Sequence, residues 1–169
     1  TQQALPTMCV VLGATGRGGP LSNIGDVDYS KMVHGEQEIV LHKPLPTNAT
    51  VLSTSKIANI YDKEKAALVI LETTAIDNSD GEKMFTNISK LFFRGEGGWG
   101  GDRGPSEKFE FPDRDADHVI KYSTRTDQAL LYRLNGDRNP LHSDPSFAAL
   151  GGFPKPILHG LCTYGFTGR

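Results

Sequence analysis

The residues best suited to chemistry lie in one short stretch, residues 135–160, which reads NGDRNPLHSDPSFAALGGFPKPILHG. Asp137 and His142 stand five positions apart, with Asn139 and Pro140 between them. Proline fixes its own φ and moves the preceding residue out of the helical region, so this stretch is conformationally constrained. A neutral histidine titrates near working pH, and a carboxylate is its natural partner. The spacing therefore predicts a carboxylate–imidazole pair that transfers a proton.

Two other interpretations of these residues remain open. Asn-Gly followed by Asp is a common turn, and Asp144 followed by Pro145 is a common helix start, so the side chains could be purely structural. His142, Asp144 and the later His159 also resemble the two-histidine, one-carboxylate ligand set of non-haem iron oxygenases. Because an N-cap position before a proline explains Asp144, we expect no metal site.

Bulk properties narrow the possible classes. The 169 residues allow one domain or two small ones, and the net charge of −2 gives no electrostatic footprint for nucleic acid. No apolar run reaches ~18 residues, so we expect no transmembrane helix. Residues 1–16 lack the basic start and long apolar centre of a secretory signal, so no targeting signal is visible. Two isolated cysteines, Cys9 and Cys162, predict reduced core residues.

The elements that must position the polar stretch begin with a sheet. Consecutive strand-like runs separated by short turns predict an antiparallel meander. The four runs are residues 38–43, 50–62, 67–76 and 83–94. The glycine-rich residues 95–104 predict either a flexible linker or a loop that approaches a ligand closely, with Trp99 and Arg103 able to touch it.

The second half of the chain predicts shorter elements. Residues 105–116 are polar and contain two prolines, which indicates an internal boundary. We expect a short strand over residues 117–122 and then three short helices. The helices should begin at Thr126, at Asp144 and at His159.

The string from Gly136 to His142, G-D-R-N-P-L-H, followed by K-P-I-L-H-G at residues 155–160, resembles the (R)-specific enoyl-CoA hydratases. These are the type 2, or MaoC-like, hydratases, which also form the middle domain of peroxisomal multifunctional enzyme type 2. The resemblance implies an α+β hot-dog fold, a long helix wrapped by a curved antiparallel sheet, present twice in tandem. Residues 1–104 would form a first, non-catalytic repeat, residues 105–116 a linker, and residues 117–169 the start of a second, catalytic repeat.

The same resemblance implies reversible hydration of trans-2-enoyl-CoA to (3R)-3-hydroxyacyl-CoA in fatty-acid β-oxidation. Coenzyme A would be part of the substrate, and no cofactor is expected. Asp137 and His142 would activate the water, Asn139 would orient it, and the Gly160 amide would hold the thioester oxygen. The resemblance also implies a set of substrate contacts: His34, Gly35, Lys63, Arg138, Pro140 and Leu141. A non-catalytic hot-dog module that binds acyl-CoA or lipid is the alternative.

The resemblance further implies a homodimer with an acyl-CoA thioester as its partner molecule. In a eukaryote the location would be peroxisomal, and otherwise cytoplasmic. The helix beginning near Gly160 would expose Leu161, Tyr164 and Phe166, and so short a helix is marginal in water without packing. We therefore expect the second hot dog to be truncated at Arg169 and to need a downstream segment.

Overall fold

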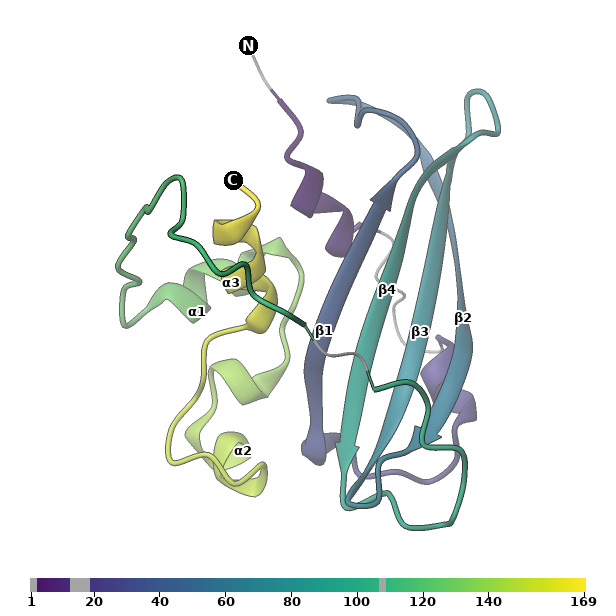
Figure 1. Ribbon diagram of the computed structural model, residues 1–169, viewed down its shortest axis with the longest axis vertical. Coiled ribbons are helices and arrows are strands. Elements are labelled where there is room, and N and C mark those ends of the chain that lie inside the picture. The colour runs from purple at the N-terminus through teal and green to yellow at the C-terminus, as the bar shows by residue number, and fades with distance from the viewer. Residues whose placement is uncertain (1–2, 13–18, 107–108) are drawn as a thin grey trace.

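A four-stranded antiparallel sheet forms the body of this computed structural model, which describes residues 3–12, 19–106 and 109–169 (Figure 1). The order across the sheet is β1-β4-β3-β2. The strands are β1 (Met32–Leu41), β2 (Val51–Asp62), β3 (Ala66–Asp77) and β4 (Lys83–Arg94). The predicted strands are therefore present, with β1 beginning earlier than expected.

The meander prediction holds for β2, β3 and β4 but is wrong for β1. β1 pairs with β4, at the far side of the sheet from β2. Pro44 and Pro46 lie in the connection after β1 and cannot donate to a strand ladder, so no tight hairpin joins β1 to β2. As a consequence, β1 is an edge strand, and the second half of the chain lies beyond its unpaired edge.

Side chains that alternate along the strands divide the sheet into two faces. One face carries most of the core and is covered by the N-terminal 3-10 helices η1 (Pro6–Val10) and η2 (Pro20–Asn23). One cluster on it contains Ala67, Val69, Leu91 and Phe93, and the other contains Cys9, Ala75, Met84 and Phe85. Both cysteines are free and buried, as predicted.

A β-bulge at Gly35 shapes the edge strand. The register with β4 shifts between His34 and Glu36, so Gly35 has no paired residue. A Cβ built at Gly35 would come within 2.6 Å of the Phe92 ring, which leaves room only for glycine unless the ring moves. His34 pairs with Leu91 and therefore shares the core-bearing face.

The glycine-rich segment after β4 is folded around one carboxylate. Asp62 is 4% exposed and accepts four backbone N–H groups, at 2.7 to 3.3 Å. The donors are Glu64, Gly98, Gly100 and Gly101. These hydrogen bonds give the loop a defined path, which argues against the flexible-linker interpretation. Within this loop, Trp99 is 52% exposed to solvent.

Short helices gather beyond the β1 edge (Figure 1). The α-helices are α1 (Gln128–Tyr132), α2 (Pro145–Leu150) and α3 (Gly160–Thr167), and the remaining 3-10 helices are η3 (Tyr29–Lys31), η4 (Arg133–Asn135) and η5 (Pro140–His142). The longest described helix, α3, has eight residues. None of these helices combines the length and apolarity that crossing a membrane requires.

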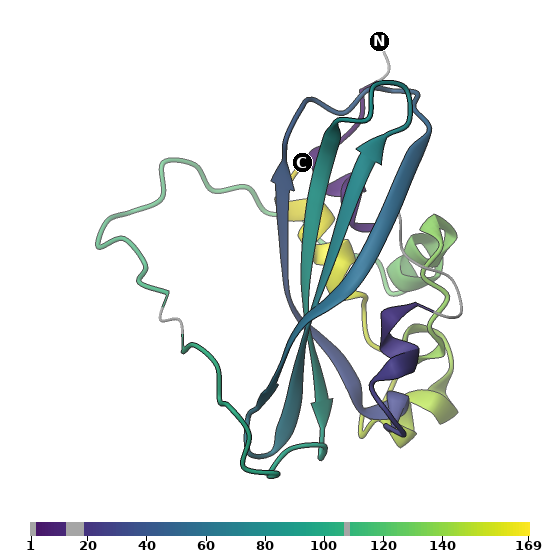
Figure 2. The same cartoon turned by 90° about the vertical axis from the view of Figure 1, so that its right-hand side faces the viewer.

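The strand predicted over residues 117–122 is absent. This segment belongs to a connection that arches away from the sheet (Figure 2). Val119 and Ile120 are 72% and 74% exposed. A strand needs a neighbour to take its backbone hydrogen bonds, and the described part of the chain offers this segment none.

The helix predicted to start at Thr126 begins two residues later, at Gln128. The Asp127 carboxylate is held by the Arg125 guanidinium at 2.7 and 2.8 Å, so no side chain caps the helix. By contrast, Asp144 caps α2 as predicted, since its Oδ1 accepts two backbone N–H groups of the first turn.

The sheet should lose stability in acid through Asp77. Hydrogen bonds from Ser79 and the charge of Lys43 lower the pKa of Asp77 from 3.8 to about 2. A carboxylate with a depressed folded-state pKa stabilises the fold fully above its unfolded pKa. We therefore expect the free energy of unfolding to fall as pH drops from about 4 towards 2. Urea titrations over this range should show a shallower pH slope for Asp77→Asn, and an unchanged slope would contradict the assignment.

Candidate active site

A cavity of about 440 Å³ lies where the polar motif faces the edge of the sheet. Its walls come from β1 and β4 on one side and from residues 137–161 on the other. The predicted catalytic residues Asp137, Asn139, His142 and Gly160 all line it. The other lining residues are mostly apolar: Met32, Val33, Leu91, Leu141, Ile157, Leu158 and Leu161, with His34 and His159. Folding therefore brings the four predicted catalytic residues to one cavity.

Local turns hold Asp137 in place. Gly136 ends the preceding helical segment at a φ of 115°, in the region that favours glycine. Asp137 Oδ1 then accepts the backbone N–H of Asn139 at 3.1 Å, and Asn139 Oδ1 accepts the N–H of Leu141 at 3.0 Å. Asp and Asn commonly close such turns on the backbone two residues ahead. The Asn139 oxygen is thus occupied, and its NH₂ group is left for the predicted water contact.

The backbone also selects the tautomer of His142. Its Nδ1 lies 2.8 Å from the carbonyl oxygen of Ile157, and because a carbonyl only accepts, Nδ1 carries the proton. The neutral ring then presents Nε2 as an acceptor, as a general base must. A ring nitrogen of His142 and a carboxylate oxygen of Asp137 lie within 4.8 Å, without a direct hydrogen bond within the described ranges. This spacing suits one water between them.

A second imidazole, that of His159, packs against the first. The His159 side chain is 1% exposed, and its ring stacks on His142 with centroids 3.7 Å apart. The centroid of the Tyr132 ring lies 4.7 Å from that of the His159 ring. His159 Nε2 lies 3.2 Å from the carbonyl oxygen of Asp137, so Nε2 carries the proton. Burial and the adjacent His142 lower the pKa of His159, which keeps it neutral at working pH.

Gly160 brings a free backbone N–H to the same cavity. It is the first residue of α3, and amides in a first turn have no acceptor within the helix. This N–H donates to no group in the described ranges. A Cβ built at Gly160 would meet no atom within 4 Å, so the approach to the amide is open.

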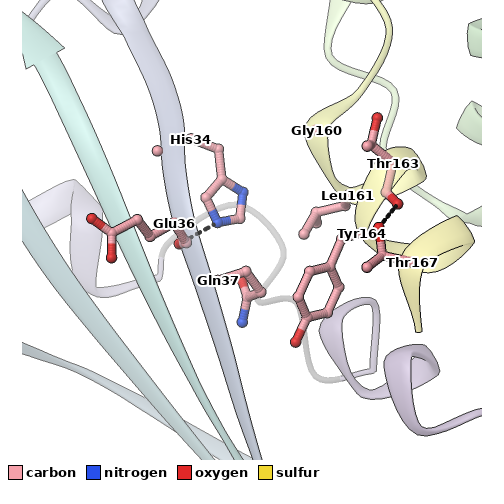
Figure 3. Close-up of a pocket in the computed structure, with 9 residues that line it drawn as sticks. His34, Glu36, Gln37, Gly160, Leu161, Thr163, Tyr164 and Thr167 are labelled. Atoms are coloured by element: carbon pink, nitrogen blue, oxygen red, sulfur yellow. Dashed lines mark hydrogen bonds between the residues drawn. The ribbon is translucent and has the colours of Figure 1, made fainter. Parts of the chain in front are cut away.

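A second cavity of about 270 Å³ lies next to the first, between β1 and α3 (Figure 3). His34, Gly160 and Leu161 line both cavities. Gln37 of β1 and Tyr164 of α3 face each other across it (Figure 3). The two cavities are therefore neighbours, one at the polar motif and the other beside the edge strand.

Of the predicted contacts, His34 lines both cavities and Gly35 lines the second. His34 Nε2 donates to the carbonyl oxygen of Glu36 at 3.0 Å, which leaves Nδ1 as an acceptor in the neutral ring. Burial lowers the pKa of His34, although the hydrogen bonds with Glu36 and with the Gln37 side chain, and the charge of Asp137, act in the opposite direction. A neutral imidazole at this junction can accept a hydrogen bond from a bound molecule.

Of the other predicted substrate contacts, only one lines the first cavity. Leu141 is 5% exposed and lines the first cavity, whereas Arg138 and Pro140 are exposed and stand outside its described lining. Lys63 lies in a separate cavity of about 210 Å³, on the opposite face of the sheet. Its Nζ donates to the carbonyl oxygen of Pro105 at 3.2 Å. The structure thus does not bring Lys63 to the motif.

The polar cluster does not suit a metal ion. Donor atoms of Asp137, His142 and His159 lie within 4.8 Å of one another, the spacing of a possible ligand set. The two ring planes are stacked at an angle of only 26°, however, so one nearby ion could not lie in both planes, as in-plane lone pairs require. Asp144, the carboxylate of the alternative iron set, is engaged instead at the start of α2.

The apolar side chains of α3 are less exposed than expected. Leu161, Tyr164 and Phe166 are each partly buried, because α3 packs beside η1 and β1. The Phe166 ring also lies 6.0 Å from that of Tyr122.

Two family models match the chain in succession. The model described as the MFE-2 hydratase 2 N-terminal domain matches residues 1–95, and the MaoC-like domain matches residues 108–169. The chain belongs to the MaoC-like hydratase 2 family. In this hydratase 2 chain the first model covers the whole sheet, and the second covers the polar motif and all three α-helices.

Relatives match nearly all of this hydratase 2 chain. It is 47% identical to 3-hydroxyacyl-thioester dehydratase Y of Mycobacterium tuberculosis, over 99% of this chain and 59% of the relative. It is 41% identical to the peroxisomal enoyl-CoA hydratase 2 of Arabidopsis thaliana, over 98% and 57%. The MaoC-like dehydratase from Phytophthora capsici superposes with a TM-score of 0.84 at 31% identity, over 99% of this chain and 61% of that one. The predicted hot-dog fold is confirmed, and the chain spans about three-fifths of the length of these relatives.

Two contributors to the site could not be predicted from the sequence. The carbonyl of Ile157 selects the tautomer of His142, and a backbone carbonyl leaves no residue-type signal. The packing of Tyr132 on His159 joins residues that are far apart in the chain. His159 does have a sequence signal, since it directly precedes Gly160, but that signal suggests only a helix start or a metal ligand.

Proposed function

We propose that this chain carries the catalytic motif for reversible hydration of trans-2-enoyl-CoA to (3R)-3-hydroxyacyl-CoA in fatty-acid β-oxidation. The observation that supports it is the convergence of a general-base pair, Asp137 and His142, and an unpaired amide, that of Gly160, on one cavity. The names of the relatives, which include enoyl-CoA hydratases and a thioester dehydratase, agree with this chemistry.

The hydration step divides between the two ends of the cavity. One water binds between Asp137 and His142, with the Asn139 amide group orienting it. His142 Nε2 takes a proton from the water as its oxygen bonds to the β carbon of the substrate. The pair returns a proton to the α carbon, so the hydroxyl and hydrogen of one water add across the double bond.

The thioester oxygen carries the negative charge that grows during this addition. The Gly160 N–H, at the positive end of α3, donates to that oxygen. A single preorganised donor of this kind contributes roughly 3 kcal/mol to a transition state in other enzymes.

The rest of the substrate extends beyond the motif. Residues 1–104 form the non-catalytic repeat, because they contain no second G-D-x-N-P-x-H string, and the cavity beside His34 and Gly35 receives the acyl chain. Coenzyme A is carried by the substrate, and the reaction needs no cofactor. Arg138 and Pro140, exposed beside the motif, then act at the coenzyme A end. The active protein is a homodimer, peroxisomal in a eukaryote and cytoplasmic otherwise.

A hydration assay with trans-2-enoyl-CoA substrates of increasing chain length tests this function. We expect turnover of medium and long chains, a 3R product by chiral analysis, and no loss of rate with a metal chelator. A 3S product would contradict the assignment, and so would activity confined to four-carbon substrates. Tight binding of enoyl-CoA without turnover would favour the non-catalytic binding module.

A further inference from the structure

His159 has the least exposed side chain of the buried polar residues in the described ranges, at 1%. It nevertheless has a costly feature, because its Nδ1 is buried without a hydrogen-bond partner in those ranges. A buried ring nitrogen that lacks a partner destabilises a fold, and a purely apolar ring would pack without that cost. The contacts that could offset this cost are those of its other nitrogen and of its ring.

Three contacts connect His159 to the parts of the proposed active site. Its Nε2–H donates to the backbone carbonyl of Asp137 at 3.2 Å. One face of its ring supports the His142 ring at 3.7 Å, with an interplanar angle of 26°. Its own carbonyl accepts the N–H of Cys162 at 3.0 Å and so begins the helix whose first amide is that of Gly160.

We propose that His159 is a positioning residue that, as a neutral ring protonated on Nε2, aligns Asp137 and His142 without exchanging protons with the substrate. This inference rests on the proposed hydratase function. It assigns the two histidines opposite tautomers: His142 carries its proton on Nδ1 and uses Nε2, whereas His159 carries its proton on Nε2 and leaves Nδ1 unused.

The groups around His159 favour this state. His142, stacked on it, and Arg133 both oppose a positive charge, as burial does, and Asp137 alone favours one. Tyr132, on the other side of the ring, stays a neutral phenol because burial raises its pKa to about 12. A protonated His159 would also place a second N–H, on Nδ1, where no acceptor is present among the described residues.

Two substitutions separate the ring from the hydrogen bond. His159→Phe keeps an aromatic ring between Tyr132 and His142 but removes the donor and the unpaired nitrogen. His159→Gln keeps an N–H donor near the position of Nε2 but removes the ring. We expect His159→Phe to melt at the same or a higher temperature while kcat for hydration falls roughly 10- to 100-fold, since small misplacements of catalytic groups have effects of this size. KM should stay within about twofold, because uniform binding is unchanged.

His159→Gln should recover part of the lost kcat. His118 is exposed, so His118→Phe is the matched control and should change neither kcat nor the melting temperature. Full kcat in a folded His159→Phe variant would overturn the proposal. It would also be overturned if kcat fell only in proportion to the folded fraction, since a purely structural role predicts that result.

The tautomer can be read without any activity measurement. Long-range ¹H–¹⁵N spectra of histidine-labelled protein, assigned with His159→Gln, should show His159 protonated on Nε2 and neutral at pH 7, with a pKa below that of an ordinary histidine. A proton on Nδ1, or a charged ring at neutral pH, would refute the proposal even if His159→Phe does not fold. If the unmodified protein hydrates no enoyl-CoA, the proposed function fails, whereas this spectrum still decides the state of His159.

Discussion

Asp137→Asn and His142→Asn should each lower kcat for enoyl-CoA hydration by roughly 10²- to 10⁴-fold, the usual contribution of a positioned general acid or base. Both substitutions spare the local structure. In Asp137→Asn the new amide oxygen can still accept the backbone N–H of Asn139, and in His142→Asn the new amide NH₂ can replace the Nδ1–H that donates to Ile157. Thermal melting should therefore change little, and steady-state kinetics should show the loss.

The double substitution should be only slightly worse than either single one, because groups that act as a unit on one water are not additive. Asp144→Asn is the matched control, since asparagine is a good N-cap and α2 should keep its start. Near-normal kcat in either single variant would exclude the shared-water mechanism. A large loss in Asp144→Asn would instead revive the iron-ligand interpretation.

Gly160→Pro should lower kcat by roughly 10²- to 10³-fold, the effect of removing one oxyanion donor. Proline has no N–H, and it is well tolerated at the first position of a helix. His159 has φ −59° and ψ 131°, an extended conformation that a following proline allows. The space around a Cβ at this position is empty, so α3 should still form.

Gly160→Ala separates the donor from the bulk, because alanine adds a methyl group and keeps the N–H. It should retain most of the activity that Gly160→Pro loses, with both variants melting close to the unmodified protein. Equal losses in the two variants would show that bulk, and not the missing donor, is responsible. A folded Gly160→Pro variant with full kcat would remove Gly160 from the oxyanion site.

Local features of this protein could be predicted from the sequence because neighbours in the chain determine them. Asp144 before Pro145 caps α2, and Asn139 before Pro140 caps η5, since a short polar side chain reaches only the backbone beside it. Runs rich in β-branched residues, bounded by turns, likewise predicted the strands. The motif from Gly136 to His142 was enough to identify both the hot-dog fold, which the comparisons confirm, and a candidate catalytic pair.

The position of a strand in the fold depends on the segments that pair with it, and these segments are distant in the sequence. The strand predicted over residues 117–122 has the right residue types but no neighbour to pair with among the described residues, so it stays extended and exposed. β1 is next to β4 because long-range pairing, and not chain order, decides a sheet. That placement makes β1 the edge that faces α3.

Tertiary structure alone also decided which of the candidate residues meet. It places Lys63 on the opposite face of the sheet, although residue type suits a phosphate contact. It stacks His159 on His142 and points an Ile157 carbonyl at Nδ1, so that the protonation state of each ring follows from a backbone oxygen elsewhere in the fold. The sequence by itself determines which groups can transfer a proton. Only the folded chain determines which nitrogen holds that proton, because a tautomer is selected by the acceptor that packing brings to it.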